Sequence, residues 1–171
     1  MKKNITITAY SFLIACLMAG TSLHAQQKAS PPKVSKATVN GTDITINYSS
    51  PSKKGRDIYG GLVPFDKVWR TGANEATTLE LSKDAKVGEL DVKAGKYALF
   101  TIPGKSEWTI IINSNAKQWG AYDYDKSKDI GRFKVSTTSL DDVIESFAIN
   151  ISDAGVVSIV WDQTKVEFTI K

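Results

Sequence analysis

Residues 97–112 read YALFTIPGKSEWTIII, and this stretch decides the fold. Two dense apolar runs, at 97–102 and 109–112, flank a Pro-Gly turn at 103–104. Short apolar runs rich in β-branched and aromatic residues are typical of strands in the middle of a sheet. We therefore predict two central strands here.

Outside this stretch, apolar residues alternate with polar ones. The clearest alternating runs lie at 43–48 (DITINY), 77–82 (TTLELS), 147–151 and 166–170. A period of two is typical of a strand that buries one face. Turn signals separate the runs and predict hairpins at Asn40-Gly41 and at Asp153-Ala154-Gly155.

The whole chain follows this pattern, with about nine strand-like runs and no clear helical periodicity. We predict an all-β fold, a mostly antiparallel β-sandwich, with a jelly-roll or Greek-key barrel as the alternative. At most one short helix is expected. Residues 139–146 (SLDDVIES) are its candidate, because Ser139 suits an N-cap and acids follow in the first turn.

The first 25 residues have the three parts of a secretory signal peptide. Lys2 and Lys3 precede an apolar run at 5–19, and a more polar stretch ends in Ala25. The apolar run is shorter than the roughly 20 residues that a membrane span needs. We predict cleavage after Ala25, export to the periplasm or the medium, and no stable membrane insertion after processing.

A lipoprotein is the alternative, because residues 13–16 (LIAC) fit a lipid-attachment box at Cys16. The residues after Cys16 continue the apolar run, whereas a lipoprotein usually becomes polar there. After the signal peptide at 1–25, residues 26–32 (QQKASPP) are interpreted as a flexible leader. Residues 33–171 are predicted to form a single β domain.

Residues 26–171 contain no Cys, His or Met. This composition excludes disulfides, thiol or imidazole catalysis, Cys/His zinc sites, haem and iron–sulfur clusters in the processed protein. We predict no cofactor and no metal site, and we assign no catalytic residue. Carboxylate, amine, hydroxyl, amide and aromatic chemistry remain.

The net charge is +4, from 22 basic and 18 acidic residues. The lysines are scattered among acids, and no basic block with interleaved aromatics occurs. Nucleic acid binding relies on such a clustered positive surface. We therefore predict no nucleic acid partner, while the sequence leaves the oligomeric state open.

Residues 50–78 interrupt the alternation for longest. They contain glycines, prolines, charges of both signs and the aromatics Tyr59, Phe65 and Trp69. An irregular stretch of this length inside a compact domain is usually functional or disordered. Its aromatic content argues against disorder, so the segment is the first place to look for a site.

The same segment carries a long motif, KGRxIYGGLVPFxKVWRTGANEAT, at residues 54–77. Two further motifs follow, AGKYALFTIPGKxEWTIIIN at 94–113 and QWGAYxYD at 118–125. Together they resemble the bacterial domain of unknown function 2911 family, over nearly all of residues 30–171. The resemblance implies an exported, β-rich protein without an established activity, and it supplies no catalytic residues.

The irregular segment offers candidate ligand-binding residues by their chemistry. A guanidinium clamps carboxylates or sugar hydroxyls, and amides and carboxylates add hydrogen bonds. The candidates are Arg56, Tyr59, Trp69, Arg70, Asn74 and Glu75. The competing interpretation is structural: Arg70 pairs with Glu75 across a tight turn at Gly72 and pins the loop.

Residues 119–125 (WGAYDYD) add the candidates Trp119 and Tyr122. Flat aromatic faces beside carboxylates suit sugar rings, whereas the alternative is core or edge-strand packing. The acids of 123–129 have the spacing of a calcium loop, but the Gly and the closing Glu of an EF-hand are missing. We interpret these acids as a solvated turn.

The favoured function is an exported, non-catalytic binding module for a small polar ligand or a glycan. The alternatives are an envelope structural or assembly protein and a carboxylate-dependent hydrolase. A glycoside hydrolase needs two carboxylates roughly 5–10 Å apart, and the sequence does not place such a pair. No G-x-S-x-G nucleophile motif occurs either.

Overall fold

The computed structural model describes residues 29–171, so the predicted signal peptide at 1–25 and residues 26–28 of the predicted leader lie outside the described residues. All ladders between its named strands are antiparallel. The strands are β1 (Pro32–Val39), β2 (Thr42–Ser49), β3 (Thr78–Leu81), β4 (Ala85–Val87), β5 (Leu90–Val92), β6 (Gly95–Ile102), β7 (Glu107–Asn113), β8 (Asp129–Ile151) and β9 (Val156–Thr169).

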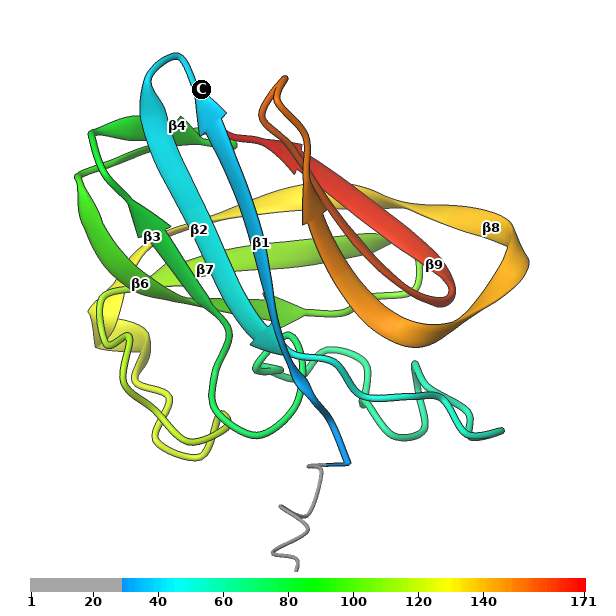
Figure 1. The fold of residues 1–171 in the computed structure, drawn as a ribbon. Coiled ribbons are helices and arrows are strands. Elements are labelled where there is room, and N and C mark those ends of the chain that lie inside the picture. The colour runs from blue at the N-terminus through cyan, green and yellow to red at the C-terminus, as the bar shows by residue number, and fades with distance from the viewer. Residues whose placement is uncertain (1–28) are drawn as a thin grey trace, which may run out of the picture.

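Seven of these strands form one sheet in the order β1-β2-β3-β6-β7-β8-β9, and β4 and β5 form a second, two-stranded sheet (Figure 1). The predicted all-β, antiparallel fold is confirmed. The predicted hairpins are confirmed as well, since Asn40 and Gly41 join β1 to β2 and residues 152–155 join β8 to β9.

The stretch 97–112 supplies the centre of the large sheet, as the sequence predicts. Phe100 of β6 pairs with Ile111 of β7, and their neighbours along both strands are buried. Leu99 faces the main core, whereas Phe100 and Ile111 face a smaller apolar cluster on the other side of the sheet. Both faces of these strands are therefore covered.

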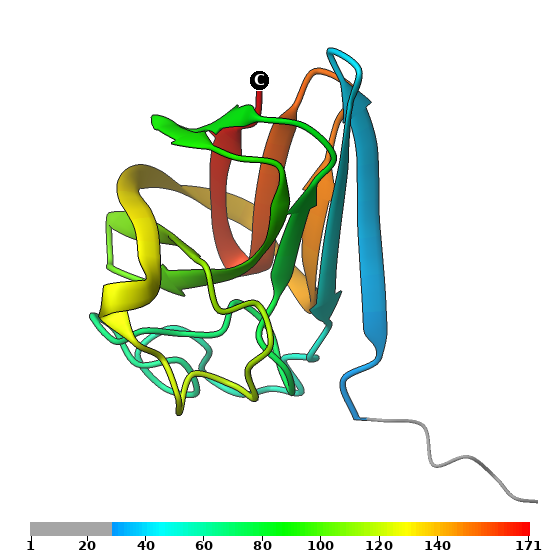
Figure 2. The same cartoon turned by 90° about the vertical axis from the view of Figure 1, so that its left-hand side faces the viewer.

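β8 is 23 residues long and curls the sheet (Figure 2). Its pairing with β9 shifts register twice, between Ser139 and Ile144 and between Ile144 and Ala148. Its far end reaches β1, where the Ile151 amide donates to Ser35 Oγ at 3.0 Å. The curl brings the two ends of the sheet around one shared core.

The helical turn predicted at 139–146 is wrong, because these residues belong to β8. Residues 139–146 lack a period of two because the register of β8 against β9 shifts within them. Pairing with β9 keeps this stretch extended despite the local N-cap signal at Ser139. The helical element of the described chain is instead a single 3₁₀ turn, η1 (Lys126–Lys128).

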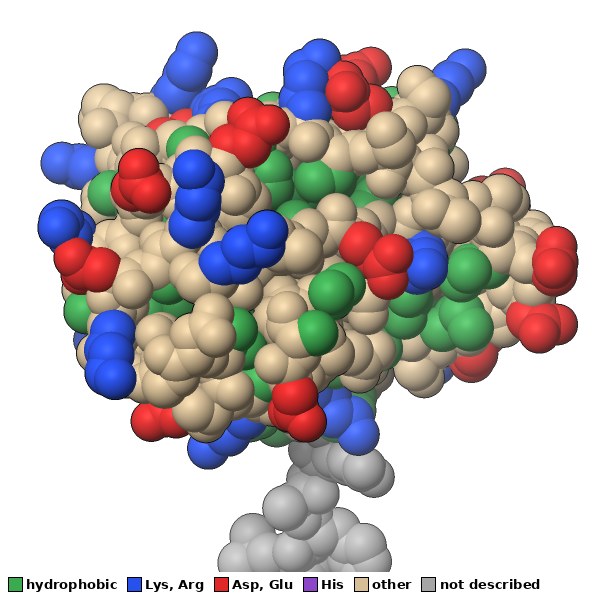
Figure 3. Space-filling view, turned by 90° about the horizontal axis from the view of Figure 1, so that it is seen from above, with side chains coloured by type: hydrophobic (Ala, Val, Ile, Leu, Met, Phe, Trp, Pro, Cys, Tyr) green, Lys and Arg blue, Asp and Glu red, His purple; other side chains and the backbone are tan. Residues whose placement is uncertain are grey.

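The core contains a cluster of aromatic rings next to the segment 50–77. Trp69 stacks on Trp161 with ring centroids 6.1 Å apart, and Trp108 and Phe147 meet Trp69 edge-on. The opposite end of the molecule is closed by β4, whose Lys86 exchanges backbone hydrogen bonds with Lys171. Seen from above, that end carries acidic and basic side chains interspersed (Figure 3).

Candidate functional site

The segment 50–77 begins against the bend of β8. The amide of Lys53 donates to the Glu145 carbonyl at 2.7 Å, and the amide of Phe147 donates to the Pro51 carbonyl at 2.9 Å. The Lys53 ammonium forms a salt bridge of 2.8 Å with Asp162 of β9. The irregular segment is thus attached to the sheet by both backbone and side chains.

Further along, Trp69 fixes the segment to β6. Its amide donates to the Thr101 carbonyl at 2.7 Å, and its carbonyl accepts from the Thr101 amide at 3.0 Å. The indole Nε1 donates to the Gly72 carbonyl at 3.1 Å. Trp69 is therefore a core residue whose ring also shapes the turn that follows it.

That turn has an unusual backbone. Thr71 is fully buried and has a φ of 56°, which is rare for a β-branched residue. Its conformation is held by hydrogen bonds, from Thr77 Oγ1 to the Thr71 carbonyl at 2.6 Å and between the hydroxyls of Thr71 and Thr101 at 3.1 Å. Asn74 also has a positive φ, of 59°. The surrounding structure imposes this strained path directly after Arg70.

A second segment, residues 114–128, joins the first. The Ala76 amide donates to the Gln118 carbonyl and the Gly120 amide donates to the Asn74 carbonyl, both at 3.1 Å. An outward turn, defined here as residues 119–123, presents two aromatic side chains to solvent. Trp119 is 57% exposed and Tyr122 is 83% exposed.

The outward turn is supported by a polar network at the start of β8. Asp129 accepts from the Tyr124 hydroxyl and from Arg132 Nε, each at 2.7 Å, and from Asn113 Nδ2 at 2.9 Å. Arg132 also donates to the Tyr124 hydroxyl. Burial, together with the hydrogen bond to Asp129, raises the pKa of Tyr124 to about 12. The network holds the base of the segment 114–128.

The same contacts define the role of the acids at 123–129. Asp125 accepts from the Ser127 amide at 2.8 Å and caps η1, while Asp129 is occupied by the network. Residues 29–171 contain no group of three or more acids, His or Cys placed to hold a metal ion. The calcium-like spacing therefore serves a turn.

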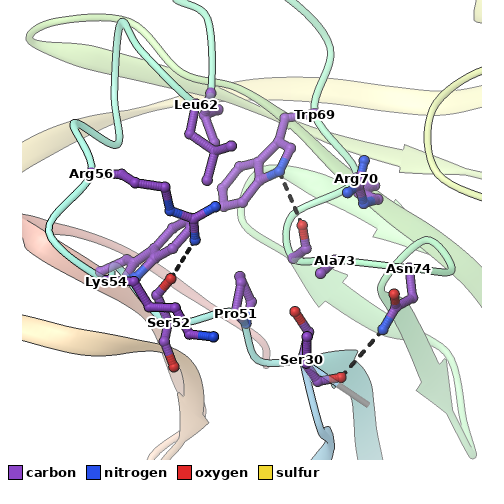
Figure 4. Close-up of a pocket in the computed structure, with 14 residues that line it drawn as sticks. Ser30, Pro51, Ser52, Lys54, Arg56, Leu62, Trp69, Arg70, Ala73 and Asn74 are labelled. Atoms are coloured by element: carbon purple, nitrogen blue, oxygen red, sulfur yellow. Dashed lines mark hydrogen bonds between the residues drawn. The ribbon is translucent and has the colours of Figure 1, made fainter.

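Two pockets meet at Arg70. The first, of about 340 Å³, lies between the segment 50–77 and the chain just before β1 (Figure 4). The second, of about 290 Å³, lies between the stretch 62–70 and the outward turn that carries Tyr122. The residues that line both pockets are Leu62, Val63, Trp69 and Arg70.

Arg70 is the side chain that these pockets share and that has polar atoms to offer. Its Nε is buried and has no hydrogen-bond partner. The salt bridges within residues 29–171 do not include Arg70, so the alternative in which it pairs with Glu75 finds no support in these contacts. A buried N–H without an acceptor costs about 1–3 kcal/mol and calls for an explanation.

The structure brings half of the predicted candidates together in the first pocket, namely Arg56, Trp69, Arg70 and Asn74. Arg56 is exposed there and donates to the carbonyls of Lys53 and Ser52, at 2.9 and 2.5 Å. Asn74 donates from Nδ2 to the Ser30 carbonyl at 3.2 Å and so ties the pocket to the chain before β1 (Figure 4).

The other candidates are spread over neighbouring places. Tyr122 lines the second pocket, and Glu75 and Trp119 line a separate pocket of about 480 Å³. Tyr59 belongs to the aromatic core, where its ring meets Trp108 edge-on at 5.0 Å. Its hydroxyl is buried without a partner, and burial and the nearby Asp162 raise its pKa.

Sequence reasoning missed Lys54, Leu62 and Trp161, which also line the first pocket. Lys54 and Leu62 lie in the irregular segment 50–78, and the unusual length of that segment is the sequence feature that could have pointed to them. Trp161 arrives from β9 and has no local signal. The residues that line the two Arg70 pockets include no Asp or Glu.

No helix among residues 29–171 is both long and apolar enough to cross a membrane. Comparison with curated proteins and with solved structures found no match. A family model described as "Protein of unknown function (DUF2911)" matches residues 30–170, which covers the domain and every candidate residue. The chain therefore belongs to the DUF2911 family of proteins of unknown function.

Proposed function

We propose that the protein binds a small polar ligand or a glycan at Arg70, in the two pockets that meet there. One observation carries the proposal: Arg70 Nε is buried and has no partner. Buried N–H groups in folded proteins are almost always satisfied. Nε itself is covered, so an oxygen atom of a ligand in either pocket would bind the outer nitrogens of the same guanidinium, Nη1 and Nη2, which are not among these buried atoms.

The aromatic side chains around Arg70 support the same proposal. Trp69 forms the inner wall of both pockets, and Tyr122 stands exposed at the edge of the second. An exposed ring on a well-supported turn offers a flat face at low entropic cost, which suits the C–H face of a sugar. The network of Tyr124, Asp129 and Arg132 supplies that support.

The strained backbone after Arg70 is a further argument. Backbone conformations of this kind cost free energy and concentrate at functional sites. Thr71 and Asn74 both have positive φ values, and hydrogen bonds to neighbouring elements hold them there. The strain fixes Arg70 at the junction of the two pockets.

The alternative functions have less support. A carboxylate-dependent hydrolase would need a pair of acids in its cleft. No acid lines the Arg70 pockets, and of Asp57 and Asp162, which line another pocket, Asp162 is held in the salt bridge with Lys53. An assembly protein would offer an unprotected sheet edge. β1 lies at the edge of the sheet, and exposed Lys33 and Lys36 guard it against strand pairing.

A thermal-shift screen of sugars and small polar metabolites, combined with a glycan array, tests the proposal. A ligand at about 100 times its dissociation constant adds roughly 2.7 kcal/mol to the free energy of unfolding. We expect at least one ligand to raise the melting temperature, and Arg70→Ala to remove this shift. Lys86→Ala, at the opposite end of the molecule, is the control. Hits that are indifferent to Arg70→Ala, or no hits at all, would contradict the proposal.

We also propose that the protein works after export, on the basis of the signal peptide pattern at 1–25. N-terminal sequencing of protein from the periplasm or the medium should begin at Gln26. A chain that begins at Met1 would contradict export, and a lipid on Cys16 would favour the lipoprotein alternative.

A further inference from the structure

We infer that the ligand carries an anionic group, a carboxylate, phosphate or sulfate, and that Arg70 binds this group. The inference rests on the proposed function and adds the charge of the ligand to it. It follows from three features of the pockets: the sign of their charges, the free donors of Arg70, and the position of Tyr122.

The charged side chains that line the pockets are all basic. Lys54 and Arg56 line the first pocket, Lys67 lines the second, and Arg70 lines both. This arrangement differs from the end seen in Figure 3, where acids and bases are interspersed. Opposite charges attract strongly when they are partly withdrawn from water. The pockets therefore favour an anion over a neutral ligand of the same shape.

Two acids that contact the segment 50–77 are engaged with groups other than Arg70. Asp162 forms a salt bridge of 2.8 Å with Lys53, which does not line either pocket. Glu145 accepts from the backbone amide of Lys54 at 2.9 Å through Oε1. Neither of these two carboxylates forms a salt bridge with Arg70.

Arg70 and Arg56 have different parts in this arrangement. Arg56 already donates from Nε and Nη2 to the backbone carbonyls of Lys53 and Ser52, which hold its guanidinium beside the pocket. Figure 4 shows the bond to Ser52. Arg70 has its Nε unused. A guanidinium with free donors binds the oxygens of a carboxylate, phosphate or sulfate in pairs. Arg70 is therefore the anchor, and Arg56 and Lys54 add charge.

The surroundings of Gly120 show how close the Tyr122 ring lies to Arg70. A Cβ atom at Gly120 would lie 3.1 Å from the Tyr122 ring and 3.8 Å from Arg70 Nη1. Gly120 therefore lets the chain pass close to the Tyr122 ring, and the ring and the Arg70 guanidinium lie near one another on either side of it. An acidic group on a ring-shaped ligand can reach Arg70 while the ring lies on Tyr122.

The test compares an acidic sugar with its neutral ester. The probes are trigalacturonate and its fully methyl-esterified form, with inorganic phosphate and inorganic sulfate as separate arms. Binding is measured by calorimetry at two salt concentrations, to the purified protein and to two variants that each lose one positive charge. These are Arg70→Gln, at the site, and Lys86→Gln, at the opposite end. Arg70→Lys, which keeps the charge, is the second site variant, and melting curves check that all variants fold.

We expect at least one anionic probe to bind, the neutral ester to bind at least about tenfold more weakly, and Arg70→Gln to lose about tenfold or more. Higher salt should weaken binding of the anion, and Lys86→Gln should bind like the parent protein. Equal binding of the ester and the acid, with loss in Arg70→Gln, would overturn the anion inference and leave the binding module intact. Failure of every anionic probe, while neutral sugars shift the melting temperature, would overturn it as well. If no probe or screened ligand binds, both proposals fall.

Discussion

Arg132 and Arg70 are both partly buried arginines beside the same outward turn, and they differ in their partners. Arg132 at the start of β8 bonds Asp129 at 2.7 Å and lies with its guanidinium carbon 5.9 Å from the centre of the Tyr124 ring. Arg70 at the end of the segment 50–77 has a buried Nε without an acceptor. The sequence alone does not show this difference, although it makes Arg70 a candidate ligand-binding residue.

This difference in partners distinguishes an arginine that stabilises the fold from an arginine that is open to a ligand. A charge whose donors are satisfied inside the protein contributes to stability, because its removal leaves its partners unpaired. A charge whose donors are left open costs stability, and proteins retain such a cost where function requires it. The Arg132 network therefore holds the outward turn in place, and Arg70, next to this turn, is open to a ligand.

The largest expected effect concerns Trp69, whose side chain lines both pockets. Trp69→Ala should lower the free energy of unfolding by about 3–5 kcal/mol, because it leaves a cavity among large rings. Chemical denaturation with far-UV circular dichroism measures this. A loss below about 1 kcal/mol would mean that the indole is not part of the core, and the account of how Arg70 is positioned would fail.

The next effect tests the supporting arginine. Asp129→Ala removes the acceptor shared by Tyr124, Arg132 and Asn113, and should cost about 2–3 kcal/mol, as expected for hydrogen bonds to a charged group. Glu80→Ala is the control, since the Glu80–Lys96 pair is half-exposed and 3.6 Å long, and should cost less than about 1 kcal/mol. Similar losses in the two variants would mean that the network gives no special support.

The central part of the fold could be predicted from the sequence because its signals are local. The runs of 97–112 have the composition of buried strands, and Asn40-Gly41 specifies a tight turn by itself. The long bend of β8 could not be predicted, because two register shifts scramble the period of two and only pairing with β9 keeps 139–146 extended.

The candidate site shows the same limit. The length and chemistry of the segment 50–78 drew attention to Arg70, Arg56 and Asn74, which the structure brings to one pocket. The side chain of Tyr59 has the same chemistry as that of Tyr122, yet it lies in the core. Whether a tyrosine faces the core or solvent depends on neighbours from distant strands, which the sequence does not place.

A smaller effect on the Arg132 network is expected from the ionisation of Tyr124 at high pH. Tyr124 should titrate at about 12 instead of its ordinary 10.0, because burial and Asp129 favour the neutral phenol. In the folded protein the phenol keeps its proton to higher pH than in the unfolded chain. Its contribution to stability is therefore complete below about pH 10 and is lost as the pH rises toward 12.

The measurement is an NMR titration of ring-labelled tyrosine, assigned with Tyr124→Phe. In Asp129→Asn the midpoint should move down toward the ordinary value, since the negative charge that opposes phenolate formation is removed. An unchanged midpoint in that variant would mean that Asp129 does not hold the phenol, and the network would lose its central member.

The smallest expected effect concerns Arg70 itself. Arg70→Gln should change the free energy of unfolding by less than about 0.5 kcal/mol, or raise it, because no hydrogen bond of Nε is lost and a positive charge near Lys54 and Arg56 is removed. If Arg70 were paired and buried, removal of its partner would cost about 3–5 kcal/mol. A double-mutant cycle with Glu75 distinguishes the two cases. A coupling energy below about 0.5 kcal/mol agrees with an open guanidinium. A larger value would mean that Arg70, like Arg132, is paired inside the protein and that the segment 50–77 has a purely structural role.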